Sequence, residues 1–393
     1  MIAQSVHPES TAPAPDVSTA RSAESSPDAV LVFATQGAGH GDETRIIELV
    51  SGLKSARFAF DRGGKARSGW QLFRKICRER PPLVVMEGTG IGGGVAVLMG
   101  RLIARVPYVV SSGDAVGPYL SARMPLMTPL FALYERMLCQ FSAGFIGWTP
   151  YLVGRALTFG SPRGVTAPGW CERRQSDGDR FAARDRIRAS LGIGPDDIVF
   201  GIAGSLDWNP RVGYCYGYEL VHAGVRARRR GLRILIVGDG SGRKHLELAA
   251  GGELGKSILM TGRVPREKVA DYLAAMDIGS LPQSVDGVGS FRYTIKLSEY
   301  IAASLPIVTG QIPLAYDLDD GWLWRLAGHA PWDERYLRSL AALMQTIKPQ
   351  GIADKRSAVP VGSSLFERET QVRRVGEFLH DLMESKERGG HAS

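Results

Sequence analysis

Short apolar runs, separated by segments with the apolar spacing of helices, recur along this chain from residue 29 onwards. Most of the runs end in a turn that is rich in glycine or polar residues. Runs of this kind are typical of parallel strands that helices cover on both faces. The pattern therefore predicts an α/β fold with doubly wound sheets. The first series of predicted strands lies at residues 30–33, 83–86, 107–110 and 144–147.

A second series follows a polar, turn-forming stretch at residues 168–179, with predicted strands at residues 198–201, 234–237, 257–261, 278–281 and 307–309. The two series indicate two Rossmann-like domains, at residues 28–170 and 181–350, with a linker at residues 171–180. Ligands of such sheets bind at the carboxyl ends of the strands. We therefore expect a binding cleft where the two domains face each other.

The two ends of the chain differ from this pattern. Residues 1–27 are rich in Ser, Ala and Pro and have almost no bulky apolar side chains, which predicts a disordered tail. Residues 365–387 have the period and charge pattern of a helix, so the segment 351–393 is predicted to be a C-terminal helix with a frayed end.

Composition and charge narrow the class of protein. The hydrophobic content of 44% and the charged content of 22% are typical of globular proteins. A net charge of +8 indicates an anionic partner, such as a nucleotide or a phospholipid surface. The four cysteines are scattered and predict neither zinc nor a disulfide framework. We expect no secretory signal and no membrane-spanning segment, and therefore a cytoplasmic location.

The most informative stretch is residues 262–309, which reads as helix, strand, glycine-rich loop, helix and strand. Lys296 and Glu299 lie in the first turns of the second helix and share one helix face. The loop before them, with Gly289 and Ser290, offers N–H groups beside the positive end of the helix dipole. A lysine there suits a diphosphate, and a carboxylate one turn later suits paired sugar hydroxyls. The stretch predicts a site for a nucleotide that carries a sugar.

The order of these features resembles the donor-site signature of family-four glycosyltransferases. The resemblance extends upstream through residues 204–210, 234–240 and 262–264, and it covers most of the second half of the chain. It implies a GT-B fold, in which two Rossmann-like domains face each other across a cleft and the C-terminal helix returns to the first domain. The matching features are an apolar strand, Pro282, the glycine loop, Lys296, Glu299, Ala302, Ala303, Pro306 and a final strand.

The resemblance also implies roles for individual residues. Lys296 and Arg211 would stabilise charge on the donor diphosphate, and Glu299 would hold the ribose. The reaction would retain the anomeric configuration, with no metal and no cofactor. Asp317 and Asp319 spell the D-x-D pattern of a different architecture, which turn formation explains better. Further donor contacts are expected at Gly238, Gly240, Val264, Gly289 and Ser290.

The sequence departs from the family pattern at three positions. Phe291 stands where the pattern has the first of two glutamates, Ser205 where many members have arginine, and Ser304 where glycine is usual. These departures leave open a non-catalytic partner subunit with the same fold. A sugar-nucleotide epimerase on this fold is a second alternative, and it would need an acid/base pair at the sugar.

The resemblance places the loop with Gly37 and Gly39 and the turn at residues 111–114 on the acceptor side. His40 could bind or deprotonate an acceptor hydroxyl, since the ordinary pKa of histidine is near ~6.5, or it could cap a helix. Asp114 could orient an acceptor hydroxyl or cap the following turn. Residues 88–93 match the dinucleotide pattern G-x-G-x-x-G, but a close approach of helix and sheet would explain these glycines too.

Basic residues are dense in residues 54–80, where Trp70 and other apolar residues lie among them, and residues 119–145 are rich in Met, Leu and Phe. These segments could contact an anionic membrane or could be solvated helix faces. No nucleic-acid-binding module is recognisable. We predict a hexosyl-type glycosyltransferase that moves a sugar from a nucleotide sugar to a carbohydrate or lipid-linked acceptor. It would act in polysaccharide or glycolipid biosynthesis, in the cytoplasm or peripherally on the inner face of the membrane.

Overall fold

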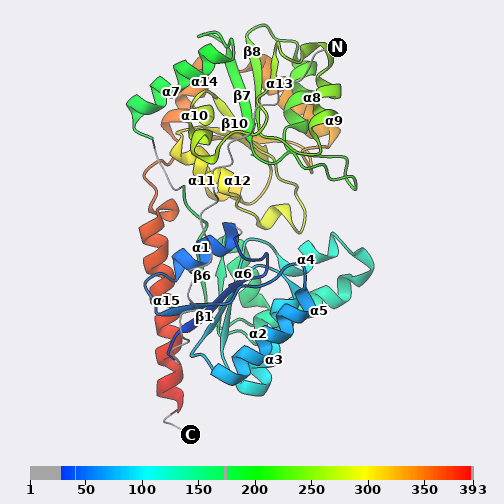
Figure 1. The fold of residues 1–393 in the computed structure, drawn as a ribbon. Helices are drawn as coiled ribbons and strands as arrows, with labels where there is room; N and C mark the ends of the chain where they lie inside the picture. Colours follow the sequence, from blue (N-terminus) through cyan, green and yellow to red (C-terminus); the bar gives the residue numbers. More distant parts are fainter. Residues whose placement is uncertain (1–27, 40, 172–174, 391–393) are drawn as a thin grey trace, which may run out of the picture.

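Two parallel six-stranded sheets form the centres of the two halves of the chain (Figure 1). The computed structural model describes residues 28–39, 41–171 and 175–390. The tail predicted at residues 1–27 and His40 lie outside the described residues. The two domains lie end to end, with the second domain above the first in Figure 1.

The N-terminal sheet has the strand order β2-β1-β3-β4-β5-β6, and all of its strand pairs are parallel. Every residue of β1, β3, β4 and β5 is buried, which explains why these strands are mostly apolar, with polar residues only at the carboxyl ends of β3 and β4. The strands are β1 (Val30–Ala34), β2 (Ser55–Arg57), β3 (Val84–Glu87), β4 (Tyr108–Ser112), β5 (Gly144–Gly147) and β6 (Gly164–Thr166).

Helices cover both faces of this sheet. Leu72, Val97 and Leu138, from three of the helices, pack into one apolar cluster with the sheet. Leu49 and Leu379, from the first and the last helix of the chain, pack into the cluster on the other face. The helices of this domain are α1 (Gly41–Leu49), α2 (Lys65–Glu79), α3 (Ile91–Ala104), α4 (Val116–Ser121), the 3₁₀ turn η2 (Pro125–Met127), α5 (Thr128–Gln140) and α6 (Pro150–Thr158).

The C-terminal sheet has the strand order β12-β11-β10-β7-β8-β9, again entirely parallel. Its strands are β7 (Ile198–Ala203), β8 (Leu232–Val237), β9 (Ile258–Met260), β10 (Ile278–Leu281), β11 (Ile307–Gly310) and β12 (Leu323–Leu326). The main helices are α7 (Asp177–Ser190), α8 (Tyr218–Ala227), α9 (Arg243–Ala250), α10 (Val269–Ala274), α11 (Ile295–Ala302), α12 (Leu314–Asp317), α13 (Glu334–Thr346), α14 (Pro349–Ser357) and α15 (Arg368–Gly390). Short 3₁₀ turns are η3 (Gly251–Glu253), η4 (Arg266–Lys268), η5 (Gly289–Phe291) and η6 (Ser364–Phe366).

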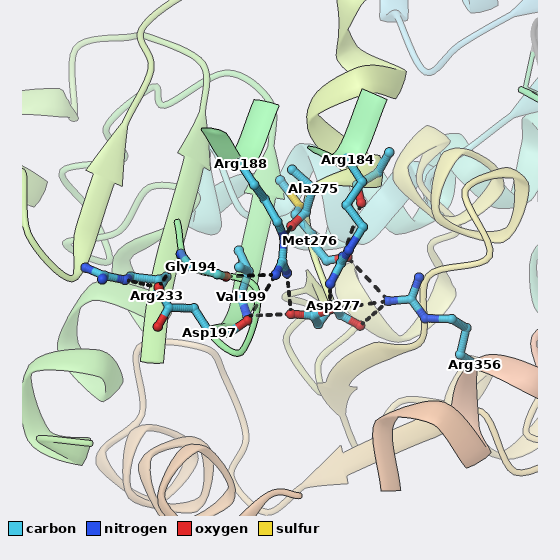
Figure 2. A network of polar contacts seen from close by, with 11 residues as sticks. Arg184, Arg188, Gly194, Asp197, Val199, Arg233, Ala275, Met276, Asp277 and Arg356 are labelled. Atoms are coloured by element: carbon cyan, nitrogen blue, oxygen red, sulfur yellow. Dashed lines mark hydrogen bonds and ion pairs between the residues drawn. The ribbon is translucent and has the colours of Figure 1, made fainter. Parts of the chain in front are cut away.

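A polar network ties the amino end of the second sheet to two helices (Figure 2). The Asp277 carboxylate, just before β10, accepts hydrogen bonds from Arg184 and Arg188 of α7 at 2.8 and 2.7 Å. It also accepts one from the Val199 N–H of β7, and Arg356 of α14 donates to the Asp277 carbonyl. This network lies at the amino end of the sheet, which is opposite to the carboxyl end where we expect the cleft.

The chain crosses between the domains twice and ends on the first one. The side chain of Gln371 in α15 exchanges two hydrogen bonds of 2.9 Å with the backbone of Gly169. Arg368 forms an ion pair with Glu48 of α1 at 2.7 Å, and Val375 and Leu379 are fully buried. Helix α15 thus packs on the N-terminal domain, whereas α14, inside the segment predicted as the returning helix, packs on the C-terminal domain.

The predicted fold class, two doubly wound α/β domains, is confirmed. Three strands, β2, β6 and β12, are absent from the two predicted series of apolar runs, and all of them lie at sheet edges. Their residues are partly exposed, so they do not form a short, uniformly apolar run. No helix in the described part of the chain is long and apolar enough to cross a bilayer.

Candidate functional site

A cleft of about 600 Å³ lies between the carboxyl ends of the two sheets. Its N-terminal wall consists of residues that follow β1, β3, β4 and β5, together with the start of α1. Its C-terminal wall consists of residues that follow β7, β8 and β9, together with the start of α11. The main lining residues are Gln36, Asp42, Glu87, Gly88, Asp114 and Trp148 on one side, and Gly204, Tyr216, Gly238, Arg263, Val264, Arg292, Thr294, Lys296 and Glu299 on the other.

Lys296 reaches across the C-terminal wall towards the end of β7. Its Nζ lies 4.0 Å from the centre of the Tyr216 ring, which is a cation–π contact. A Cβ atom on Gly204 would lie only 2.9 Å from this Nζ, so glycine at position 204 leaves the space that the ammonium group occupies. Gly204 is the first residue of the upstream motif in the predicted donor signature. The loop after β7 and the start of α11 therefore form one local site.

The start of α11 has features of an anion-binding site. Thr294 is the N-cap residue and has extended backbone angles, but its side chain does not cap the helix. The buried Thr294 Oγ1 has no hydrogen-bond partner among the described residues. Buried polar groups without partners are rare, and the first N–H groups of a helix also lack partners within the helix. A diphosphate at this point could accept from the hydroxyl and from these N–H groups, next to the Lys296 cation.

An ion pair crosses the cleft between the two domains. The Arg292 guanidinium, in the loop before α11, bonds to the carboxylate of Asp114, which follows β4. Burial alone would lower the pKa of Arg292, but Asp114 raises this pKa above its ordinary value. Asp114, predicted on the acceptor side, thus lies in the cleft with a cationic partner from the donor side.

The rest of this loop docks on the N-terminal domain. The Phe291 ring packs against the apolar cluster of that domain, with the Arg155 guanidinium 5.4 Å from the ring centre. The Phe291 carbonyl accepts a hydrogen bond of 2.9 Å from Thr149 Oγ1. Phe291 therefore occupies the family's first glutamate position but does not line the cleft, and its contacts join the two domains.

Asp286 organises the same loop from within. Its carboxylate accepts hydrogen bonds from the N–H groups of Val288 and Gly289, both at 2.8 Å. Burial raises the pKa of Asp286. The hydrogen bonds from these N–H groups and the nearby Arg292 cation lower the pKa by more than burial raises it, so the net shift is downward. The Ser290 N–H donates to the Asp286 carbonyl. The N–H groups of Gly289 and Ser290 are therefore engaged inside the loop.

The predicted site residues fall into two groups by position. Lys296, Glu299, Gly238, Val264 and Asp114 line the cleft. Those not among the lining residues are Arg211, Gly240, Gly289, Ser290, Gly37 and Gly39. The roles of both groups stay predictions.

Two of the residues outside the cleft lining have contacts that explain their positions. Arg211 is exposed, and its guanidinium donates to the Ala122 carbonyl of the other domain at 2.5 Å. A Cβ on Gly240 would lie 2.6 Å from the backbone of Leu206, so this glycine permits two loops of the chain to touch.

A buried cluster on the N-terminal wall was not predicted. Glu87, at the end of β3, is 1% exposed and accepts from Arg45 at 2.8 Å, from Ser111 at 2.6 Å and from Trp148 Nε1 at 3.3 Å. Burial raises the pKa of Glu87, and the Arg45 cation opposes this shift. The one signal in the sequence is a glutamate directly after an apolar run, ahead of Gly88.

The glycines of the G-x-G-x-x-G match are explained by packing and backbone shape. A Cβ on Gly93 would lie 2.7 Å from the Phe33 ring, so glycine lets α3 approach β1. Asp319 of the D-x-D pattern caps the Gly321 N–H and pairs with Arg325. No group of three or more His, Cys, Asp or Glu side chains gathers in metal-binding geometry within the described residues.

Comparison with known proteins confirms the predicted resemblance. Residues 197–338 match the family model described as glycosyl transferases group 1. No protein with a curated description matches the sequence significantly.

Among solved structures, HepE of Anabaena in complex with UDP has a TM-score of 0.65 at 16% identity, over 90% of this chain and 100% of that one. Sucrose-phosphate synthase of Thermosynechococcus elongatus has a TM-score of 0.66 at 13% identity, over 91% of this chain and 100% of that one. The lipopolysaccharide outer core galactosyltransferase WaaB has a TM-score of 0.57 at 11% identity, over 91% of this chain and 99% of that one. The fold is that of GT-B glycosyltransferases.

Proposed function

We propose that this chain, whose C-terminal domain matches the glycosyl transferases group 1 family, transfers a sugar from a nucleotide diphosphate donor to an acceptor hydroxyl. The observation that carries this proposal is the start of α11 in the cleft. There a lysine, a buried hydroxyl with no hydrogen-bond partner among the described residues and the first residues of a helix line the same wall of the cleft. These groups suit a diphosphate better than they suit an uncharged ligand.

The donor side would act mainly by charge stabilisation. When the bond between the sugar and the diphosphate breaks, negative charge grows on the departing diphosphate. Lys296, the α11 N–H groups and Thr294 would stabilise that charge in a cleft that excludes most water. Arg263 also lines this wall and adds a second cation. Glu299 would hold the ribose hydroxyls, and Val264 would lie near the base.

The acceptor side carries carboxylates. Asp42, Glu87 and Asp114 line the N-terminal wall, and the half-buried Asp42 and Asp114 could accept hydrogen bonds from sugar hydroxyls. Arg45 and Arg292 compensate two of these charges. This wall suits a hydroxyl-bearing acceptor, because carboxylate oxygens accept hydrogen bonds from hydroxyl groups.

The finer features of the reaction belong to the same proposal. It would retain the anomeric configuration and need no metal, in line with the resemblance to family four. The acceptor would be a carbohydrate or a lipid-linked sugar in polysaccharide or glycolipid biosynthesis. The protein would act in the cytoplasm or on the inner face of the membrane. UDP in the similar HepE structure supports a uridine nucleotide as the first donor to test.

A turnover assay tests this function. Wild type, Lys296→Ala and Lys244→Ala would be incubated with nucleotide sugars and sugar or lipid acceptors, and released nucleoside diphosphate would be measured. Lys244 is an exposed residue of α9 and serves as the matched control. We expect release by wild type and Lys244→Ala, about 10²-fold slower release by Lys296→Ala, and no effect of a chelator.

The assay also separates the alternatives. An epimerase would convert the sugar without releasing the diphosphate. A non-catalytic partner would bind the nucleotide but release nothing with any acceptor. Release by Lys296→Ala at the wild-type rate would show that the start of α11 is not the donor site.

A further inference from the structure

The N-terminal domain exposes many large apolar side chains on neighbouring helices. Ten of the eighteen exposed large hydrophobic residues lie between Trp70 and Leu133, on α2, α3, η2 and α5, so they form a cluster. Single exposed apolar residues are normal, but a cluster of them marks an interaction site. Helix α3 packs against both α2 and α5, on the side of the domain away from α15 (Figure 1).

Two of these helices expose apolar stripes. On α3, Ile91, Val95 and Leu102 are spaced by four and seven residues, which puts them on one helix face. Leu126, Leu130 and Leu133 follow the same rule across η2 and α5, and Leu126 is 98% exposed. We call these helices, with α2, the α2–α3–α5 surface. All six side chains are at least 41% exposed.

The same surface is strongly basic. Residues 62–140 contain eleven Lys and Arg and four Asp and Glu, a net charge of +7 out of +8 for the whole chain. Of the four acids, Glu87 and Glu135 are buried, and Asp114 pairs with Arg292 in the cleft. Glu79 pairs with Lys75 and Arg78. The other basic side chains of this surface, such as Arg67 and Arg74 beside Trp70, therefore face solvent with little compensation.

Two arginines of this surface have a strained backbone conformation. Arg80 and Arg105 end α2 and α3 with left-handed φ angles of 45° and 57°. Glycine is the usual residue at such a helix end, because a side chain there strains the backbone. A cation at each position adds to the positive charge of the surface.

We infer that the α2–α3–α5 surface binds an anionic lipid bilayer. Apolar stripes flanked by Lys and Arg are the pattern of helices that lie in a membrane interface. Basic side chains near an anionic lipid surface are attracted to it, and their contributions add up. A second copy of this chain would bring the same positive charge against itself, so charge favours the lipid over a self-association.

The surface is continuous with the cleft. Gly88 and Thr89 line the cleft and lead directly into α3. The Arg292 guanidinium, which lines the cleft, lies over the Tyr119 ring of α4, 5.8 Å from the centre of that ring. A bilayer on this surface would therefore bring a lipid-anchored acceptor to the acceptor wall, a consequence that rests on the proposed function.

Vesicle sedimentation tests the inference without any nucleotide sugar. The full chain would be mixed with vesicles of phosphatidylcholine alone or with phosphatidylglycerol, at low and high salt. We expect binding only to the mixed vesicles, and weaker binding at high salt. Leu126→Asp with Leu130→Asp, and Arg67→Glu with Arg74→Glu, should each reduce the bound fraction roughly tenfold or more. All four side chains are exposed, so the variants should keep the wild-type melting temperature.

Matched controls lie on the C-terminal domain. Leu248→Asp changes an apolar residue that is 82% exposed on α9, and Arg335→Glu with Arg338→Glu makes the same charge change on α13. These variants, and Lys296→Ala, should bind vesicles as wild type does. The inference is overturned by absent binding, by equal binding to neutral vesicles, or by equal loss in the controls. Self-association abolished by Leu126→Asp, or binding to nucleic acid but not vesicles, would overturn it as well.

Discussion

Ser304 ends helix α11 in the left-handed region, with a φ of 51°. The Ser304 N–H bonds to the Ile301 carbonyl, and the Leu305 N–H bonds to the Tyr300 carbonyl. These two bonds form the Schellman motif, in which glycine is preferred at the left-handed position. The family pattern has glycine here, so this departure has a structural meaning and leaves the cleft lining unchanged.

Replacing Ser304 by glycine should stabilise the protein. Removing the side chain relieves roughly 1–2 kcal/mol of backbone strain and costs about 0.4–1 kcal/mol through the more flexible unfolded chain. We expect a gain of roughly 0.5–1 kcal/mol, measured as a higher urea midpoint. Ser339→Gly, in the middle of α13, is the control and should lose about 0.5 kcal/mol. A loss of stability in Ser304→Gly would contradict this account.

Single residues of the site were predictable only where the residues that act together are close in the sequence. Lys296 and Glu299 follow a glycine loop on one short helix, so the sequence itself brings them together. Thr294 gives no such signal, because its hydroxyl is notable only once burial leaves it without a partner. Arg292 and Glu87 depend on residues far away in the sequence, so their environments could not be read from their neighbours.

At the scale of single elements, the loop between β10 and α11 has two parts that make different contacts. Its end starts the donor site at Thr294, and its middle holds the N-terminal domain through Phe291. The side chain of Phe291 contacts the neighbouring domain, while Lys296 lines the C-terminal wall of the cleft. The loop therefore links the start of α11 to the N-terminal domain.

Phe291→Ala should loosen the two domains. Loss of the half-buried ring removes an apolar contact worth about 1–3 kcal/mol between them. We expect a larger radius of gyration in small-angle X-ray scattering, because the cleft opens, together with nearly unchanged affinity for a nucleoside diphosphate. Phe181→Ala is the control, since this exposed ring also lies beneath an arginine but within one helix. An unchanged radius in Phe291→Ala would refute this link.

Most elements were predictable from the apolar pattern, and the exceptions share one physical cause. The buried strands show themselves as apolar runs because both of their faces are covered. The edge strands β2, β6 and β12 have exposed positions and blend into the loops. Helix α7 begins at Asp177, inside the stretch predicted as linker, because Ser176 caps it.

At the scale of the whole molecule, the division into two sheets was predictable but the contacts between them were not. The ion pair of Arg292 with Asp114 joins residues 178 positions apart, and Gln371 bonds to Gly169 across 202 positions. Such pairs follow from how the domains dock, which no local pattern encodes. The docking also places Lys296, Arg263 and Arg292 of one wall opposite Asp42, Glu87 and Asp114 of the other.

The central claim is that this cleft binds a nucleoside diphosphate at the start of α11. Thermal unfolding of wild type, Lys296→Ala and the control Lys244→Ala with UDP, GDP, ADP and dTDP tests it most directly. A ligand at a hundredfold excess over its Kd adds about 2.7 kcal/mol of stability. We predict that one of the four stabilises wild type and Lys244→Ala and that Lys296→Ala loses this effect. Equal stabilisation of Lys296→Ala, or no response of wild type to any of them, would contradict the account.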